Sequence, residues 1–294
     1  MPQPLDIAEL QRRLAEAGYL ADTGLTTALA CAVTLERAVL LEGDAGVGKT
    51  DVARALAAVF DARLLRLQCY EGLDLAAAAY EWNYSRQLLA IRAAETAAQA
   101  PDLYADAYLI RRPLLAALEG ARPRSVVLLI DELDRADDEF EAFLLEFLSD
   151  FAVSIPERGT IAAVHRPIVV LTSNRTRDLH DALKRRCFYH WIEHPTVERE
   201  IAILRLHVPT LAVPLAGEVA RAVAALRTLQ LRKPPGIAES IDWAQTLQLL
   251  GTEQLAEERF AASLGTVLKY PEDLALAREA APAVLAAARA GDAA

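Results

Sequence analysis

Eight consecutive residues, 43–50, combine glycines, a lysine and a hydroxyl in a spacing that suits phosphate chemistry. They read Gly-Asp-Ala-Gly-Val-Gly-Lys-Thr and fit the pattern G-x-x-x-x-G-K-[ST]. Glycines let the backbone curl so that successive N–H groups face phosphate oxygens, and a helix that starts at the loop adds its positive end. Lys49 can reach the β- and γ-phosphates of a nucleotide, and the Thr50 hydroxyl can ligate Mg²⁺. The predicted phosphate-binding residues are Gly43, Asp44, Ala45, Gly46, Val47, Gly48, Lys49 and Thr50.

A second motif places two acids directly after an apolar run. Residues 126–130 read Val-Val-Leu-Leu-Ile, which is typical of a strand buried on both faces, and Asp131 and Glu132 follow. Such a strand carries Asp131 to the carboxyl edge of a parallel sheet, where its carboxylate can hold Mg²⁺ through the water shell of the ion. Glu132 can polarise a water for attack on a γ-phosphate. An acidic strand end is common by itself, so this interpretation depends on the phosphate loop.

Two further polar positions fit the same chemistry. Asn174 follows the apolar run 168–172 and can orient the attacking water, although a plain turn asparagine is the alternative. Arg185 and Arg186 lie in a short basic run, and either guanidinium could stabilise phosphate charge in the site of a neighbouring subunit. A solvated basic turn is the alternative for that run.

The elements that must position these residues follow from the apolar pattern. Strands are expected at residues 38–42, 63–68, 126–130, 168–172 and 188–192, alternating with helices. Residues 70–120 are expected to be mostly helix and loop, and residues 151–167 a hairpin. Only helices are expected after residue 195, at 197–207, 215–230, 239–250, 253–268 and 272–289. The chain is therefore predicted to form an α/β domain with a parallel sheet, followed by an all-α domain.

Bulk composition limits the classes of partner. The 294 residues are 53% hydrophobic and carry a net charge of −10, which disfavours nucleic acid and anionic membranes. No apolar run approaches the length of a membrane span, and the first residues lack the pattern of a signal peptide. Three cysteines without a CxxC pair favour a reduced, cytoplasmic location.

These four polar elements, in this order, resemble the AAA+ ATPases over roughly residues 5–290. The resemblance assigns residues 43–50 to Walker A, Asp131 and Glu132 to Walker B, and Asn174 to sensor 1. It favours Arg186 as the arginine finger, with Arg185 in reserve. It implies ATP and Mg²⁺ as cofactors and a five-stranded parallel sheet in an α/β domain of residues 1–195. It also implies an all-α lid of residues 196–294 and a homo-oligomer, expected to be a hexameric ring.

Within AAA+, the chain is most similar to the MoxR branch and its subgroup linked to carbon monoxide dehydrogenase maturation. Residues 67–74, 80–84, 86–89 and 233–239 carry this closer match. The long interval at 70–120 resembles the helix 2 insertion of the branch, and residues 151–167 resemble its hairpin before sensor 1. The resemblance implies a chaperone for the metal centre of a client metalloenzyme, with a von Willebrand factor A protein as partner.

Some alternatives stay open. The family often has a sensor 2 arginine at the start of a lid helix, where this chain has Glu239, so Arg232, Lys233 or no residue fills that role. Trp82 and Tyr84 fit either substrate contact or packing. The alternative function is a monomeric P-loop kinase or a nucleotide-gated binding module, which needs no arginine from a neighbouring subunit.

Overall fold

A computed structural model describes residues 5–94 and 101–290. The chain divides into two compact units that do not follow chain order. The first unit contains Met1–Ala17, Ala21–Glu42 and Thr50–Trp191, and the second contains Gly18–Leu20, Gly43–Lys49 and Ile192–Ala294. Short segments from the first 50 residues belong to the second unit, so the two units are not separated by a single point in the sequence. The domain boundary expected near residue 195 stays a prediction.

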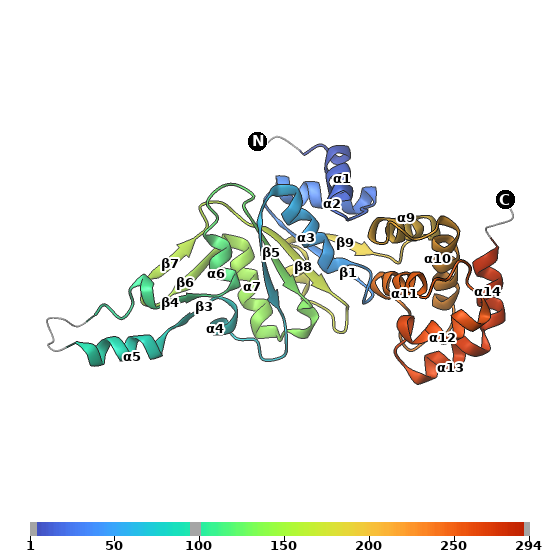
Figure 1. The fold of residues 1–294 in the computed structure, drawn as a ribbon. Helices are drawn as coiled ribbons and strands as arrows, with labels where there is room; N and C mark the ends of the chain where they lie inside the picture. The colour runs from blue at the N-terminus through green and yellow to red at the C-terminus, as the bar shows by residue number, and fades with distance from the viewer. Residues whose placement is uncertain (1–4, 95–100, 291–294) are drawn as a thin grey trace. The chain divides into compact units, whose positions relative to one another are not determined.

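A five-stranded sheet forms the centre of the first unit, in the order β2-β5-β8-β1-β9 (Figure 1). Its strands are β1 (Ala38–Gly43), β2 (Arg63–Gln68), β5 (Val126–Asp131), β8 (Ile168–Ser173) and β9 (Cys187–Ile192). β5 pairs in parallel with β2 and β8, and β8 pairs in parallel with β1. Every residue of β1, β5 and β8 is buried, because helices cover the central strands. The predicted parallel α/β sheet is confirmed.

Helices flank this sheet, and three of them begin at aspartate caps. They are α1 (Ile7–Glu16), α2 (Thr23–Thr34), α3 (Lys49–Phe60), α6 (Pro113–Leu118), α7 (Asp138–Asp150) and α8 (Asp181–Lys184). The carboxylates of Asp6, Asp22 and Asp137 accept first-turn N–H groups of α1, α2 and α7, which satisfies donors that lack an intrahelical partner. Apolar residues of α6, α7 and α8 pack into the buried core around the sheet.

The described part of the region 70–120 is mostly helix and loop, as expected, and it also contains one short strand pair. It holds α4 (Leu75–Ala78), β3 (Tyr80–Trp82), α5 (Tyr84–Ala93), η2 (Asp106–Tyr108) and β4 (Leu109–Arg111). β3 and β4 pair antiparallel, and in Figure 1 they lie with α5 beyond one end of the sheet. The expectation of mostly helix and loop missed this pair, because three-residue strands far apart in sequence leave no local periodicity.

Trp82 and Tyr84 have different environments within that region. Trp82 is buried, its Nε1 donates to Glu157 Oε2 at 3.3 Å, and its ring packs edge-on against Tyr104. Tyr84 is 64% exposed. Packing therefore accounts for Trp82 but not for Tyr84. The hairpin expected at residues 151–167 is present as β6 (Ala152–Ile155) and β7 (Gly159–Ala162).

The second unit is built from helices around its own core. They are α9 (Val197–His207), α10 (Val213–Arg227), α11 (Ile237–Leu249), α12 (Glu257–Val267), α13 (Pro271–Glu279) and α14 (Ala281–Arg289). Trp243 is fully buried there, and its Nε1 donates to Ser263 Oγ at 2.7 Å. The expectation of a single helix at 272–289 is wrong, because the helix is interrupted at Ala280. Pro282, in the first turn of α14, has no N–H to continue the helical hydrogen bonds.

The three cysteines are free thiols that differ in burial. Cys69 and Cys187 are buried free thiols, and Cys31 on α2 is half-buried. Burial raises the pKa of both Cys69 and Cys187 to about 12. None of the helices in the described part of the chain is long and apolar enough to cross a membrane.

Candidate functional site

The phosphate loop, residues 43–49, lies between the end of β1 and the start of α3. Gly43, Gly46 and Gly48 have φ values of 155°, 84° and 90°, which side chains rarely allow. A Cβ on Gly43 would lie 2.4 Å from the Ile192 carbonyl oxygen. The curled backbone therefore requires glycine at these positions, and α3 begins at Lys49, where the loop ends.

Lys49 is buried, with 6% of its surface exposed. Its Nζ donates to the carbonyl oxygens of Gly43 at 2.7 Å and Asp44 at 2.6 Å. Both acceptors are neutral, so the ammonium lies in the loop without a carboxylate in those two hydrogen bonds. An incoming phosphate could replace these carbonyls as a stronger, charged acceptor.

The start of α11 packs against the loop within the second unit. Ile237 N donates to Gly46 O at 2.8 Å, and a Cβ on Gly236 would lie 2.7 Å from Gly46 Cα. Glu239 Oε2 accepts the Gly236 N–H at 3.1 Å and caps the helix. Lys233 Nζ lies 3.7 Å from Glu239 Oε1. A backbone hydrogen bond and a helix cap thus lie against the loop at the start of α11.

Arg232, the other alternative for sensor 2, has a different environment. Its guanidinium lies over the Tyr270 ring at 4.4 Å from the centroid, and its N–H donates to Asp273 Oδ1 at 2.8 Å. This stacking holds Arg232 within the second unit.

His194 lies beside the loop and is held neutral. Its Nε2 is 3.5 Å from Asp44 Oδ2, and its Nδ1 is buried without a partner among the described residues. Burial is the largest cause of a lowered His194 pKa, and the positive charges of Arg227 and Lys49 act in the same direction. Asp44 and Glu200 oppose the shift without reversing it.

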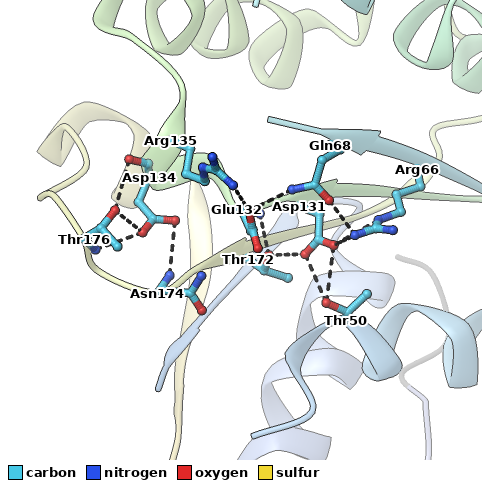
Figure 2. A network of polar contacts seen from close by, with 10 residues as sticks. All are labelled: Thr50, Arg66, Gln68, Asp131, Glu132, Asp134, Arg135, Thr172, Asn174 and Thr176. Atoms are coloured by element: carbon cyan, nitrogen blue, oxygen red, sulfur yellow. Dashed lines mark hydrogen bonds and ion pairs between the residues drawn. The ribbon is translucent and has the colours of Figure 1, made fainter. Parts of the chain in front are cut away.

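Asp131 ends β5 and is the centre of a polar network in the first unit (Figure 2). Its Oδ1 accepts the hydroxyls of Thr172 at 2.6 Å and Thr50 at 3.1 Å. Its Oδ2 accepts Nε and Nη2 of Arg66 at 3.0 and 2.6 Å. Asp131 is buried, so these partners replace the water that an exposed carboxylate would bind.

Glu132 follows in the left-handed region, with φ of 54°. Its N–H donates to Thr172 Oγ1 at 2.9 Å. Its Oε2 accepts Nε2 of Gln68 and Nη1 of Arg135, both at 3.0 Å. This unusual backbone turns the Glu132 side chain away from the direction that a continued strand would give it.

The loop that begins at Asn174 is anchored by Asp134. Its carboxylate accepts the Asn174 N–H at 3.2 Å, the Thr176 N–H at 2.9 Å and the Thr176 hydroxyl at 2.7 Å. Burial would raise the Asp134 pKa, but these hydrogen bonds outweigh it and the pKa is lowered. Asp134 therefore fixes the backbone position of Asn174 as a charged acceptor.

Glu42, at the end of β1, is a buried acid beside the same sheet edge. Its Oε2 accepts the Tyr189 hydroxyl at 3.1 Å and lies 3.7 Å from Arg175 Nε. Arg175 directly follows Asn174 and has φ of 56°. Burial and then Glu42 raise the pKa of Tyr189, which keeps its hydroxyl a donor at neutral pH.

Comparison with known proteins decides the family. The model of the AAA domain (dynein-related subfamily) matches residues 38–187, just over half of the chain. The chain belongs to the AAA domain family. No curated protein matches it significantly.

Solved structures of RuvB from Thermotoga maritima, a Holliday junction branch migration motor, are similar to the chain at low identity. A point variant of RuvB has 15% identity and a TM-score of 0.48, covering 89% of this chain and 70% of that one. The motor itself has 16% identity and a TM-score of 0.47, covering 87% and 68%. The family assignment rests on the domain match alone.

As a AAA domain, the chain has its finger candidates at the end of α8. Arg186 is exposed, and its guanidinium donates to Ser149 Oγ at 2.8 Å and Ala182 O at 3.2 Å. Arg185 is also exposed, and its carbonyl accepts Arg37 Nη2 at 2.7 Å. Arg37 thus holds the backbone of both arginines, since its Nε also donates to the Arg186 carbonyl at 3.3 Å, and the Arg186 side chain is anchored in addition.

The donor set of this AAA site fits Mg²⁺. Thr50 and Asp131 offer a hydroxyl and a carboxylate within 3.1 Å, and such hard oxygen ligands suit this cation. A positive group, Arg66, already contacts Asp131 Oδ2. The pair therefore accommodates a cation at the carboxyl end of β5.

Sequence reasoning missed several members of the network. Arg66, Gln68, Thr172 and Arg135 all contact the two acids. One usable signal was the spacing of Arg66 and Gln68, because residues two apart on a strand share a face. The other was the position of Thr172 at a strand end next to the acidic one.

Proposed function

We propose that this protein binds ATP with Mg²⁺ and hydrolyses it to ADP and phosphate. The observation that carries the proposal is the contact between Thr50 and Asp131, 3.1 Å apart, where the Walker A and Walker B sequences meet. Membership of the AAA domain family supports nucleotide hydrolysis in general. The same membership argues against the alternative of a P-loop kinase.

Each part of the site has a defined task in this proposal. The backbone N–H groups of residues 43–49 and the Lys49 ammonium bind the phosphates. Thr50 and Asp131 would hold Mg²⁺, which neutralises phosphate charge when bound. Glu132 orients and deprotonates the attacking water, with Asn174 positioned by Asp134 close to the same strand ends.

Glu132→Gln tests the proposed chemistry. Glutamine keeps the shape but cannot accept the proton of the water, so we expect nucleotide binding to stay within about twofold and turnover to fall by about 10²-fold or more. Fluorescent nucleotide titration and phosphate release measure the two properties. Glu139→Gln on α7 is the matched control, since Glu139 is exposed, and it should leave both unchanged. Normal turnover by Glu132→Gln would exclude Glu132 as the activating residue.

We further propose that the ATPase acts as a remodelling chaperone in the cytoplasm. The support is the sequence similarity of residues 67–74, 80–84, 86–89 and 233–239 to the MoxR branch, together with cysteines that form no disulfide. The proposal includes a homo-oligomeric ring, expected to be a hexamer, in which Arg186, or Arg185 in its place, reaches a neighbouring site. A von Willebrand factor A protein and a client metalloenzyme are the proposed partners.

Capture of partners tests this biological role. A Glu132→Gln variant loaded with ATP should hold its client, because hydrolysis is needed for release. Co-purification followed by identification of bound proteins should return a metalloenzyme and a von Willebrand factor A protein. A strict monomer in size-exclusion chromatography, with and without ATP, would contradict the proposed ring and favour a nucleotide-gated binding module instead.

A further inference from the structure

Arg66 forms an ion pair with Asp131, the carboxylate proposed to bind Mg²⁺. Among the described residues, it is the basic side chain whose hydrogen bonds to Asp131 are shown in Figure 2. It lies on β2, next to β5, and its guanidinium donates to Asp131 Oδ2 through both Nε and Nη2 (Figure 2). The Asp131 side chain is 4% exposed, whereas that of Arg66 is 50% exposed. The ion pair thus joins a buried carboxylate to a guanidinium whose side chain is half exposed to solvent.

Because Arg66 is half exposed and Asp131 is buried, only the Arg66 side chain is free to move away from the ion pair. If the contact breaks, the Arg66 guanidinium can return to water at little cost, since half of its side chain is already exposed. Asp131 cannot follow it, because Thr172 and the β5 backbone hold the carboxylate in place. A buried carboxylate without a positive partner is unfavourable, so another cation must replace Arg66.

The same guanidinium also contacts the other acid indirectly. Arg66 Nη2 donates to Gln68 Oε1, which leaves the Gln68 amide nitrogen facing Glu132 Oε2 at 3.0 Å. Arg66 therefore fixes the orientation of the Gln68 amide as well as the charge balance of Asp131. Its departure would remove the donor to Gln68 Oε1 and loosen the hold on Glu132.

We propose that Arg66 is an internal counter-cation of the metal site, which Mg²⁺ must displace from Asp131 when it binds with nucleotide. The inference rests on the proposed function, since it takes Thr50 and Asp131 as the residues that hold Mg²⁺. It makes Arg66 a positioning residue that sets the Mg²⁺ concentration at which the site fills. Thr50 Oγ1 also lies 3.4 Å from Asp131 Oδ2, the oxygen that Arg66 holds, so a metal between Thr50 and that oxygen would compete with the guanidinium.

A Mg²⁺ titration of nucleotide binding tests the competition without turnover. The full chain is mixed with a fluorescent ADP analogue, and binding is followed from excess EDTA to saturating Mg²⁺. Arg66→Gln removes the charge but keeps a polar side chain, so we expect the half-saturating Mg²⁺ concentration to fall at least about threefold. Arg66→Lys keeps a positive charge and should stay close to the native value.

Arg63→Gln is the matched control. Arg63 is an exposed arginine of the same strand, paired in register with Val126 at the other end of β5. It carries the same charge but lies away from Asp131, so its removal should leave the Mg²⁺ titration unchanged. Thermal unfolding without ligands confirms that each variant is folded.

Each remaining outcome contradicts the inference in a distinct way. An unchanged or raised half-saturating Mg²⁺ concentration in folded Arg66→Gln would show that Arg66 does not compete with the metal. Weaker binding of the analogue in EDTA would show that Arg66 contacts nucleotide instead. If the native chain binds no analogue at any Mg²⁺ concentration, the proposed function itself fails and this inference falls with it.

Discussion

One hydroxyl in the centre of the sheet orients both acids of the site. Thr172 Oγ1 donates to Asp131 Oδ1 and accepts the N–H of Glu132, so it uses its donor and one of its acceptor positions. Because Thr172 belongs to β8 and the acids to the end of β5, their positions depend on correct pairing of these strands. Residues with no direct role toward a nucleotide thus set the geometry of those that have one.

His194 makes a pH-dependent contribution to stability. Its pKa is lowered in the folded state, so the unfolded chain binds a proton more readily as the pH falls below about 6.5. Stability is therefore complete above the unfolded pKa and is lost as the pH falls toward the folded one. We expect the melting temperature of the native protein to decline between pH 7 and pH 5, and His194→Gln to decline less, as measured by thermal unfolding.

His207 provides the comparison for this titration. It lies at the exposed end of α9, and His207→Gln should follow the native pH profile. Parallel profiles for the native protein and His194→Gln would mean that the buried imidazole does not account for the acid sensitivity.

At the scale of elements, the start of α11 shapes the phosphate loop. Gly236→Ala would put a Cβ 2.7 Å from Gly46 Cα and 2.8 Å from Gly46 O, and these backbone atoms can move only with the loop. We expect the affinity for the fluorescent ADP analogue to fall by about tenfold or more, because misplaced N–H groups lose their phosphate contacts. Direct titration at saturating Mg²⁺ measures the effect.

A second glycine-to-alanine change separates crowding from a general effect of the substitution. Gly265 on α12 has no atom within 4 Å of an added Cβ, so Gly265→Ala should bind nucleotide normally and stabilise the helix slightly. Equal affinity of Gly236→Ala and the native protein would show that the loop tolerates displacement by α11.

The predictable elements are those whose signal is local. Buried parallel strands form continuous apolar runs, so β1, β5 and β8 could be predicted from residues 38–42, 126–130 and 168–172. The short β3 and β4 could not, since each is defined by its partner across the chain. The break between α13 and α14 had a local signal in Pro282, but a proline in a first helical turn resembles one inside a helix.

The same distinction applies to the site. The order of motifs predicted the acids and the loop, because each motif is contiguous in sequence. The partners of those acids were not predictable in this way, because Arg66 and Asp131 are far apart in sequence and meet only through the pairing of β2 with β5. Contacts across strands depend on register, which the sequence of one strand does not reveal.

At the scale of the whole molecule, the proposed ring makes a prediction about mixed assemblies. Arg186→Ala and Glu132→Gln should each be nearly inactive, one lacking the finger and the other the activating acid. A mixture of the two restores interfaces that combine an intact Glu132 with an intact Arg186, about a quarter of all interfaces in random rings. Phosphate release by the mixture should therefore greatly exceed that of either variant alone.

The reserve arginine supplies the control for this experiment. Arg185→Ala alone should retain activity if Arg186 is the finger, and it should be inactive and rescued in the mixture if the roles are reversed. Failure of both arginine variants to recover activity in mixtures would argue against a finger that acts between subunits.

The placement of the three thiols makes the protein convenient for spectroscopy. Cys69 and Cys187 are buried with pKa values of about 12, so almost none of either is present as the reactive thiolate at neutral pH. Cys31, half-buried on α2, is the one with access to reagents. A maleimide dye should therefore label one helix of the native chain without any engineered cysteine, and energy transfer between labelled copies could report assembly in real time.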